Sequence, residues 1–97
     1  MKQKFRKLSF VHVCKDMPKQ MSHFDSDFDA IIEGTYSQLY GGTDIDSYSI
    51  YMIKDGKVVN CIAWYKENQL TLLKKQDRKK AEEMIEEFNF RLEEELE

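Results

Sequence analysis

Apolar and polar residues alternate through much of residues 5–73, which is the pattern of β-strands with one buried face. Stretches rich in β-branched and aromatic residues predict five short strands, over residues 5–14, 29–36, 47–53, 58–65 and 69–73. Lys54-Asp55-Gly56-Lys57 separates the third from the fourth strand, and Asp-Gly readily adopts the positive φ angles of a type I′ turn. We therefore expect a β-hairpin at this point.

The period changes from two to about three and a half after residue 76, where an amphipathic helix is predicted over residues 77–95. Asp77 is a suitable N-cap. One stripe of the helix is apolar, comprising Ala81, Met84, Ile85, Phe88, Leu92 and Leu96. The first turn is basic and the last is acidic, which opposes the helix dipole, so we expect docking of the stripe to stabilise the helix. We favour docking on the helix's own sheet, with a helix-mediated homodimer as the alternative.

These elements predict an α+β protein, mainly β: a small SH3-like antiparallel five-stranded barrel over residues 5–74, followed by the C-terminal helix. A chain of 97 residues is too short for a second core, so residues 1–97 are expected to form one domain. Pro18 ends the first strand, and residues 19–28 are expected to form a loop. Gly34 within the second strand predicts a bulge or a close backbone approach.

Two passages carry a more specific resemblance. The first comprises Met17-Pro18, His23-Phe24-Asp25 and Ala30-Ile31-Ile32-Glu33-Gly34-Thr35-Tyr36. The second comprises Tyr40-Gly41-Gly42, Ser47-Tyr48-Ser49-Ile50-Tyr51 and Ala63-Trp64-Tyr65-Lys66-Glu67-Asn68-Gln69-Leu70-Thr71-Leu72-Leu73. Over residues 8–73 the chain is similar to a group of small, uncharacterised proteins of phages and mobile elements of Gram-positive bacteria. The resemblance implies an SH3-like (KOW-type) barrel and that setting, and it implies no catalytic residues.

Composition narrows the class of protein. With 41% hydrophobic and 34% charged residues, the chain is too apolar for a disordered protein and too polar for a membrane span. The N-terminus has no signal-peptide pattern, so we expect a cytoplasmic protein. In a reducing compartment the two cysteines, Cys14 and Cys61, are expected to be buried thiols rather than a disulfide.

The formal net charge of −3 is distributed in alternating blocks along the chain. Residues 1–20 carry +5, residues 21–50 carry −6, residues 51–76 carry +3 and residues 77–97 carry −5. On the expected fold this distribution predicts two acidic patches and a basic edge.

Two groups of residues are candidates for metal binding. Asp25, Asp27 and Asp29 have the spacing of a calcium loop, but Ala30 stands where that loop needs glycine and Tyr36 where it needs glutamate. An EF-hand is thereby excluded, which leaves a solvated acidic loop or a weaker divalent site that includes His23. A second group, His12, Cys14 and Cys61, is too scattered for a zinc site. We expect no metal and no other cofactor.

Enzymatic activity is not expected, because the chain contains no nucleophile elbow and no Cys–His signature. Gly41-Gly42-Thr43 is a weak candidate for a phosphate-binding loop and is more typical of a turn.

Aromatic residues are the most suggestive feature for binding, since exposed rings offer a large contact area at a small entropic cost. Tyr48 is expected in the core. For the other tyrosines and for Trp64, packing in the core is the alternative to binding a partner. We predict a non-enzymatic protein-interaction module, an accessory protein of a phage or mobile element. Its predicted binding residues are Tyr40, Tyr51, Trp64, Asp25 and Asp27. The alternatives are a nucleic-acid-binding barrel that uses the basic edge and an acidic antidefence or antirestriction protein.

Overall fold

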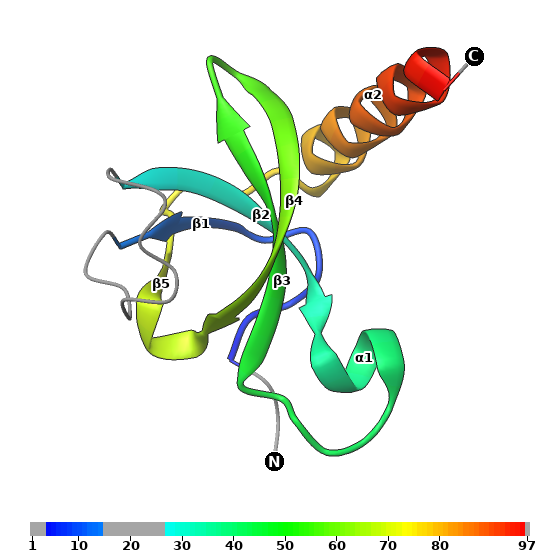
Figure 1. The fold of residues 1–97 in the computed structure, drawn as a ribbon. Coiled ribbons are helices and arrows are strands. Elements are labelled where there is room, and N and C mark those ends of the chain that lie inside the picture. The colour runs from blue at the N-terminus through cyan, green and yellow to red at the C-terminus, as the bar shows by residue number, and fades with distance from the viewer. Residues whose placement is uncertain (1–3, 15–26, 97) are drawn as a thin grey trace.

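The computed structural model describes residues 4–14 and 27–96. Their elements in chain order are β1 (Phe10–Val13), β2 (Phe28–Thr35), α1 (Tyr36–Tyr40), β3 (Ser47–Lys54), β4 (Lys57–Lys66), the 3₁₀ turn η2 (Glu67–Gln69), β5 (Leu70–Leu72) and α2 (Arg78–Leu96). Figure 1 shows a curved sheet with α1 near one end and α2 projecting from the other. Among the described residues, no helix is both long enough and apolar enough to cross a membrane.

The five strands form one antiparallel sheet in the order β4-β3-β2-β1-β5, which confirms the predicted α+β class with a C-terminal helix. The predicted closed barrel is wrong, because β4 and β5 are the two edges of the sheet and closure requires the edge strands to pair. β5 spans three residues and pairs with β1 instead. Phe5 packs in the same core cluster as Tyr65 of β4 and Leu70 of β5. Side chains, rather than a ladder of hydrogen bonds, therefore join the two edges.

Apolar residues on the concave side form the larger core cluster. Its members come from every strand and from the segment before β1, and include Phe5, Val11, Ile32, Tyr48 and Tyr65. The Tyr48 hydroxyl accepts a hydrogen bond from the backbone N–H of Phe5 at 3.1 Å, and the two rings meet edge to face at 5.5 Å. The segment before β1 is thus fixed to the core by a buried hydrogen bond as well as by a ring.

The opposite face of the sheet is covered by α2. Ala81 and Phe88 of the helix are buried in a cluster with Ile31 of β2 and Val58 of β4. The predicted N-cap is confirmed, since the Asp77 carboxylate accepts the backbone N–H of Lys80 at 3.0 Å. The apolar stripe docks on the chain's own sheet, as favoured from the sequence, but the contact is made by its first half.

Local sequence explains the hairpin and the bulge, both of which are confirmed. Asp55 and Gly56 have φ angles of 53° and 78° between paired Lys54 and Lys57. The register of β2 against β3 shifts between Ile32 and Gly34.

The first strand is shorter than predicted, because it begins at Phe10 rather than at residue 5. Leu8 has a positive φ of 69°, and its N–H bonds to the carbonyl of Ile32, so the chain turns there before it joins the sheet. Phe5 inserts into the core, and the backbone of Leu8 and Ser9 exchanges hydrogen bonds with Ile32 of β2 just before the strand begins.

The two fully buried tyrosines differ in one respect that mutation can test. The Tyr65 hydroxyl has no hydrogen-bond partner among the described residues, whereas that of Tyr48 accepts the N–H of Phe5. We expect Tyr48→Phe to destabilise the protein by about 1–2 kcal/mol, because it removes the buried hydrogen bond from the backbone N–H of Phe5 to the hydroxyl. Tyr65→Phe is expected to leave stability unchanged or raise it by about 1 kcal/mol, because it removes an unpaired buried hydroxyl. Urea unfolding of both variants measures the difference, and equal losses would contradict this assignment.

Docking of α2 can be tested with two phenylalanines on the same helix. Phe88 is 8% exposed and Phe90 is 60% exposed. Phe88→Ala is expected to cost about 2–3 kcal/mol of unfolding free energy, because the ring leaves a buried contact with Tyr51 and the sheet. Phe90→Ala serves as the control and should change stability by less than about 0.5 kcal/mol. Similar losses at the two positions in a denaturant titration would show that the helix does not dock through this face.

Candidate functional site

A short helix between β2 and β3 presents aromatic side chains to solvent. α1 begins with a capping box, in which Thr35 Oγ1 accepts the N–H of Gln38 at 3.1 Å and Gln38 Oε1 accepts the N–H of Thr35 at 2.9 Å. A Cβ at Gly34 would lie 3.0 Å from Gln38 Oε1, so glycine leaves room for this side chain. Tyr36 and Tyr40 stand four residues apart and therefore lie on one face of the helix.

The loop after α1 is held against the helix by hydrogen bonds. Ser37 donates its hydroxyl to the carbonyl of Gly42 at 2.7 Å and its N–H to the carbonyl of Asp44 at 2.9 Å. The Asp44 carboxylate accepts the backbone N–H groups of Asp46 and Ser47, each at 3.0 Å. These bonds, that of Asp46 foremost, lower the pKa of Asp44. A negative charge is thereby held beside α1.

Trp64 of β4 completes a cluster of three rings. The ring centroids lie 5.2 Å apart for Tyr36 and Tyr40, 5.1 Å for Tyr36 and Trp64, and 5.8 Å for Tyr40 and Trp64. Tyr36 is 42% exposed, Tyr40 is 72% exposed and Trp64 is half-buried. We call these residues the aromatic cluster. At such distances the rings contact one another directly, so they form a platform rather than a cage around a ligand.

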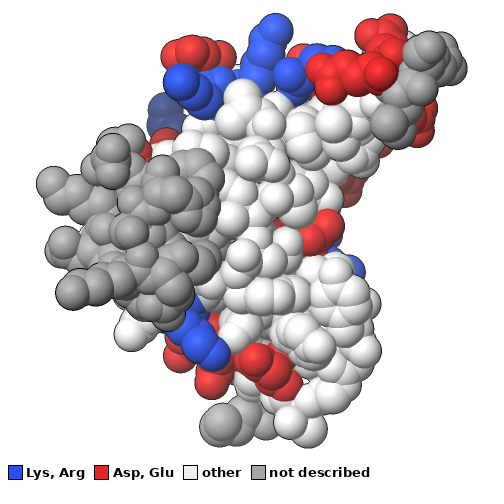
Figure 2. Space-filling model, in the orientation of Figure 1, with Lys and Arg blue, Asp and Glu red and all other residues white. Residues whose placement is uncertain are grey.

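Figure 2 shows the surroundings of this platform. The surface over α1, at the lower right, is mostly uncharged in this view, with acidic and basic side chains at its borders. Asp44 and Asp46 lie in the loop after α1, and Lys66 lies close enough to that loop to donate to Ser47 at 2.8 Å. The platform therefore combines aromatic area with a loop that carries two carboxylates.

Of the five residues predicted for binding, two lie together in the aromatic cluster, namely Tyr40 and Trp64. Tyr51 is elsewhere: its ring contacts Phe88 of α2 at 6.1 Å, and its hydroxyl donates to Glu33 at 3.0 Å. Sequence reasoning missed Tyr36 as a binding residue because it placed that position at the end of a strand. The signal that identifies α1 is the spacing of Thr35 and Gln38, which matches a capping box.

The two predicted aspartates do not join the platform. Asp25 lies outside the described residues. Asp27 precedes β2, and its carboxylate contacts His12 Nε2 at 3.0 Å, while Asp29 contacts His12 Nδ1 at 2.9 Å. Both ring nitrogens of His12 face carboxylates, so the protonated ring can donate to Asp29 and to Asp27, and these hydrogen bonds raise its pKa. Asp27 and Asp29 therefore take part in a charged contact at the start of β2. The aromatic cluster lies at the other end of this strand, because α1 follows the end of β2.

The described residues contain no group of three or more His, Cys, Asp or Glu placed to share a metal ion. At His12 the geometry explains why the nearby side chains do not share a metal ion. The two ring nitrogens point in different directions, and the two carboxylates lie on separate sides of the ring.

A second polar group lies on the face that α2 partly covers. Glu33 accepts from the Tyr51 hydroxyl and lies 3.6 Å from Cys61 Sγ, which is also 3.6 Å from Ser49 Oγ. Although much of Cys61 remains accessible, desolvation of its thiol raises the pKa, and the Glu33 carboxylate raises it further. Burial and the same carboxylate raise the pKa of Tyr51. Neither group is activated as a nucleophile by this arrangement.

Comparison with protein-family models, with curated proteins and with solved structures finds no match. The resemblance to small phage and mobile-element proteins therefore stays a prediction.

The contacts of His12 predict a pH dependence of stability. Folding raises the pKa of His12 above its unfolded value of about 6.5. The contacts of the protonated ring therefore stabilise the protein fully below pH 6.5, and this contribution is lost as the pH rises through the pKa of the folded state. We expect wild type to exceed His12→Gln in unfolding free energy most at pH 5.5 and least at pH 9. The difference should stay below about 1 kcal/mol because the pair is partly exposed and screened. Urea titrations at both pH values measure it, and a gap that widens toward pH 9 would contradict the charged pairing.

Proposed function

We propose that this chain is a non-enzymatic protein-interaction module whose aromatic cluster binds a segment of a protein partner that carries Arg or Lys. The observation that carries the proposal is the direct contact of Tyr36, Tyr40 and Trp64 at the surface. Such a patch is informative because single exposed apolar residues are common, whereas grouped large rings mark interaction sites.

Core packing accounts poorly for the platform. A ring contributes to folding through the apolar area that it removes from water, and Tyr40 keeps 72% of its area exposed. Tyr48 and Tyr65, by contrast, are fully buried in the core cluster. The exposed rings have their remaining faces available to a partner.

The chemistry of the surroundings selects the kind of partner. Asp44 is held in its ionised form beside α1, and Asp46 follows in the same loop. A guanidinium or ammonium group can stack on a tyrosine or tryptophan face while it approaches a carboxylate. Basic and apolar side chains on one extended segment would satisfy the rings and the carboxylates together.

We include in this proposal the phage or mobile-element setting and the SH3-like fold expected from the sequence. Four strands follow one another along the sheet, and β5 returns through η2 to pair with β1; this order supports an open, SH3-like arrangement. An accessory protein of a phage or mobile element would use such a domain to bind a host or phage protein.

Selection from a random peptide library displayed on phage tests this function with the full chain as bait. We expect enrichment of peptides that carry Arg or Lys next to apolar residues. For the best peptide, Tyr40→Ala and Tyr36→Ala should weaken binding at least about tenfold in fluorescence anisotropy, because each removes a stacking face. Thermal midpoints of both variants should shift by less than about 4 °C, since the two side chains are exposed.

Phe90→Ala is the matched control, because Phe90 is an exposed ring on α2 outside the aromatic cluster. It should leave peptide affinity unchanged. Enrichment of acidic peptides, or equal affinity of wild type and Tyr40→Ala, would refute the proposed function.

A further inference from the structure

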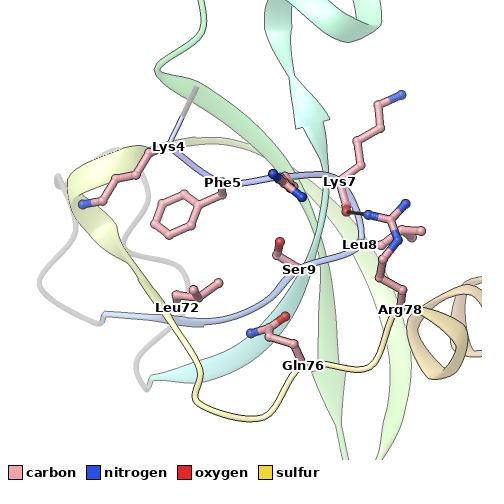
Figure 3. Close-up of a pocket in the computed structure, with 9 residues that line it drawn as sticks. Lys4, Phe5, Lys7, Leu8, Ser9, Leu72, Gln76 and Arg78 are labelled. Carbon is pink, nitrogen blue, oxygen red and sulfur yellow. Dashed lines mark hydrogen bonds between the residues drawn. The ribbon is translucent and has the colours of Figure 1, made fainter. Parts of the chain in front are cut away.

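Two basic segments that are distant in sequence lie side by side at the β5 edge of the sheet. The Gln76 side chain joins the segment between β5 and α2 to the first residue of β1, because it bonds to the backbone N–H and carbonyl of Phe10, each at 2.8 Å. Arg78 Nη1 also donates to the carbonyl of Lys7 at 3.3 Å. Figure 3 shows the two segments on either side of a hollow, with Phe5 and Leu72 at one end and Arg78 at the other. The fold thus merges both segments into one surface.

This hollow continues in both directions along the edge. It has a volume of about 350 Å³ and shares Lys4, Phe5 and Leu72 with a hollow of about 360 Å³ beside β5. It shares Gln76 with a third hollow, of about 630 Å³, that is lined by residues up to Lys80. The three hollows neighbour one another through shared lining residues, and we call them together the β5 groove.

Positive charge dominates the β5 groove. The N-terminal segment contributes Lys4 and Arg6, whereas the Lys7 side chain points out of the hollow, toward Gly34 (Figure 3). The segment after β5 and the first turn of α2 contribute Lys74, Lys75, Arg78 and Lys80.

The single acidic residue of the lining, Asp77, is engaged as the N-cap of α2. Within residues 4–14 and 27–96, none of these six cations forms an ion pair. Acidic side chains gather instead over the C-terminal part of α2, as Figure 2 shows. The groove is therefore locally cationic although the whole chain carries −3.

Beneath the cations the groove has an apolar floor. Phe5 is buried there, Leu8 is half-buried, and Leu72 on the edge strand is 52% exposed. An unpaired nucleic-acid strand has matching chemistry, because its phosphates bind Lys and Arg while its bases rest on apolar or aromatic surface. A duplex would offer phosphates alone and leave Leu72 in water, and a single phosphate would fill one part of a groove made of three hollows.

We propose that the β5 groove binds a single-stranded nucleic acid, with phosphates on its Lys and Arg side chains and bases against Leu8 and Leu72. This site is separate from the aromatic cluster on α1 and β4, and it goes beyond the proposed protein-interaction function. It offers no set of polar groups aimed at base edges, so the preference for sequence is expected to be weak.

Fluorescence anisotropy of the full chain with labelled 12-nucleotide oligothymidine DNA and oligouridine RNA tests the proposal. Affinity should fall with salt, with a slope of about −0.7 in log–log form for each phosphate that is neutralised. For a footprint of four phosphates, this corresponds to a loss of about fiftyfold between 50 and 200 mM NaCl.

Variants separate the groove from charge in general. The double variant Lys4→Ala, Lys74→Ala should weaken binding and reduce the salt slope by about 1.4, because two phosphate contacts are lost. The control Lys54→Ala, Lys57→Ala makes the same change of net charge at the hairpin and should retain wild-type affinity and slope. Leu72→Ser should weaken binding while it leaves the slope unchanged, since it alters the floor alone.

Three outcomes would overturn the proposal. The first is an absence of oligonucleotide binding at 50 mM NaCl, and the second is equal loss of affinity in the hairpin control. The third is tighter binding of a 12-base-pair duplex or of poly-glutamate than of oligothymidine, which would assign the groove to duplex DNA or to an acidic protein segment.

Discussion

Strand β2 is the element on which the rest of the structure depends, because core packs on both of its faces. Ala30 and Ile32 point into the concave cluster, whereas Ile31 between them points into the cluster under α2. All three side chains are fully buried, so a strand with two apolar parities is required in the middle of the sheet. Its two ends then position the polar features: Asp29 meets His12 at one end, and the capping box at Thr35 starts α1 at the other. Register along β2 thus determines where the aromatic cluster stands.

Much of this architecture can be predicted from the sequence because its signals are local. Asp55-Gly56 specifies a turn, and the spacing from Ala81 to Phe88 specifies a docked helix, whatever the rest of the chain does. Closure of the sheet could not be predicted in this way. Closure depends on the length of β5 and on the place where Phe5 enters the core. Both are determined by contacts between residues more than forty positions apart in the chain.

The candidate site shows the same division. Tyr40 and Trp64 are recognisable from the sequence as aromatic residues near a turn and on a strand, but their contact arises from the bulge at Gly34 and from α1. Tyr51 was a reasonable candidate by strand parity, yet the face it occupies is the one that α2 covers. Parity tells which residues share a face, and it does not tell which face another element will bury.

The segregation of charge along the chain gives the two proposed surfaces different partners. Folding brings the basic segments before β1 and after β5 together through Gln76 and Arg78, while Asp44 and Asp46 stay beside α1. If both proposals hold, the carboxylates beside α1 would disfavour a nucleic-acid strand there, and the cations of the groove would disfavour a basic peptide, since like charges repel. The two proposed surfaces lie on different parts of the sheet, so binding at one would not cover the other. Simultaneous binding would place a protein segment and a nucleic-acid strand at fixed positions on one small sheet, which is a physical basis for an accessory protein that brings the two together.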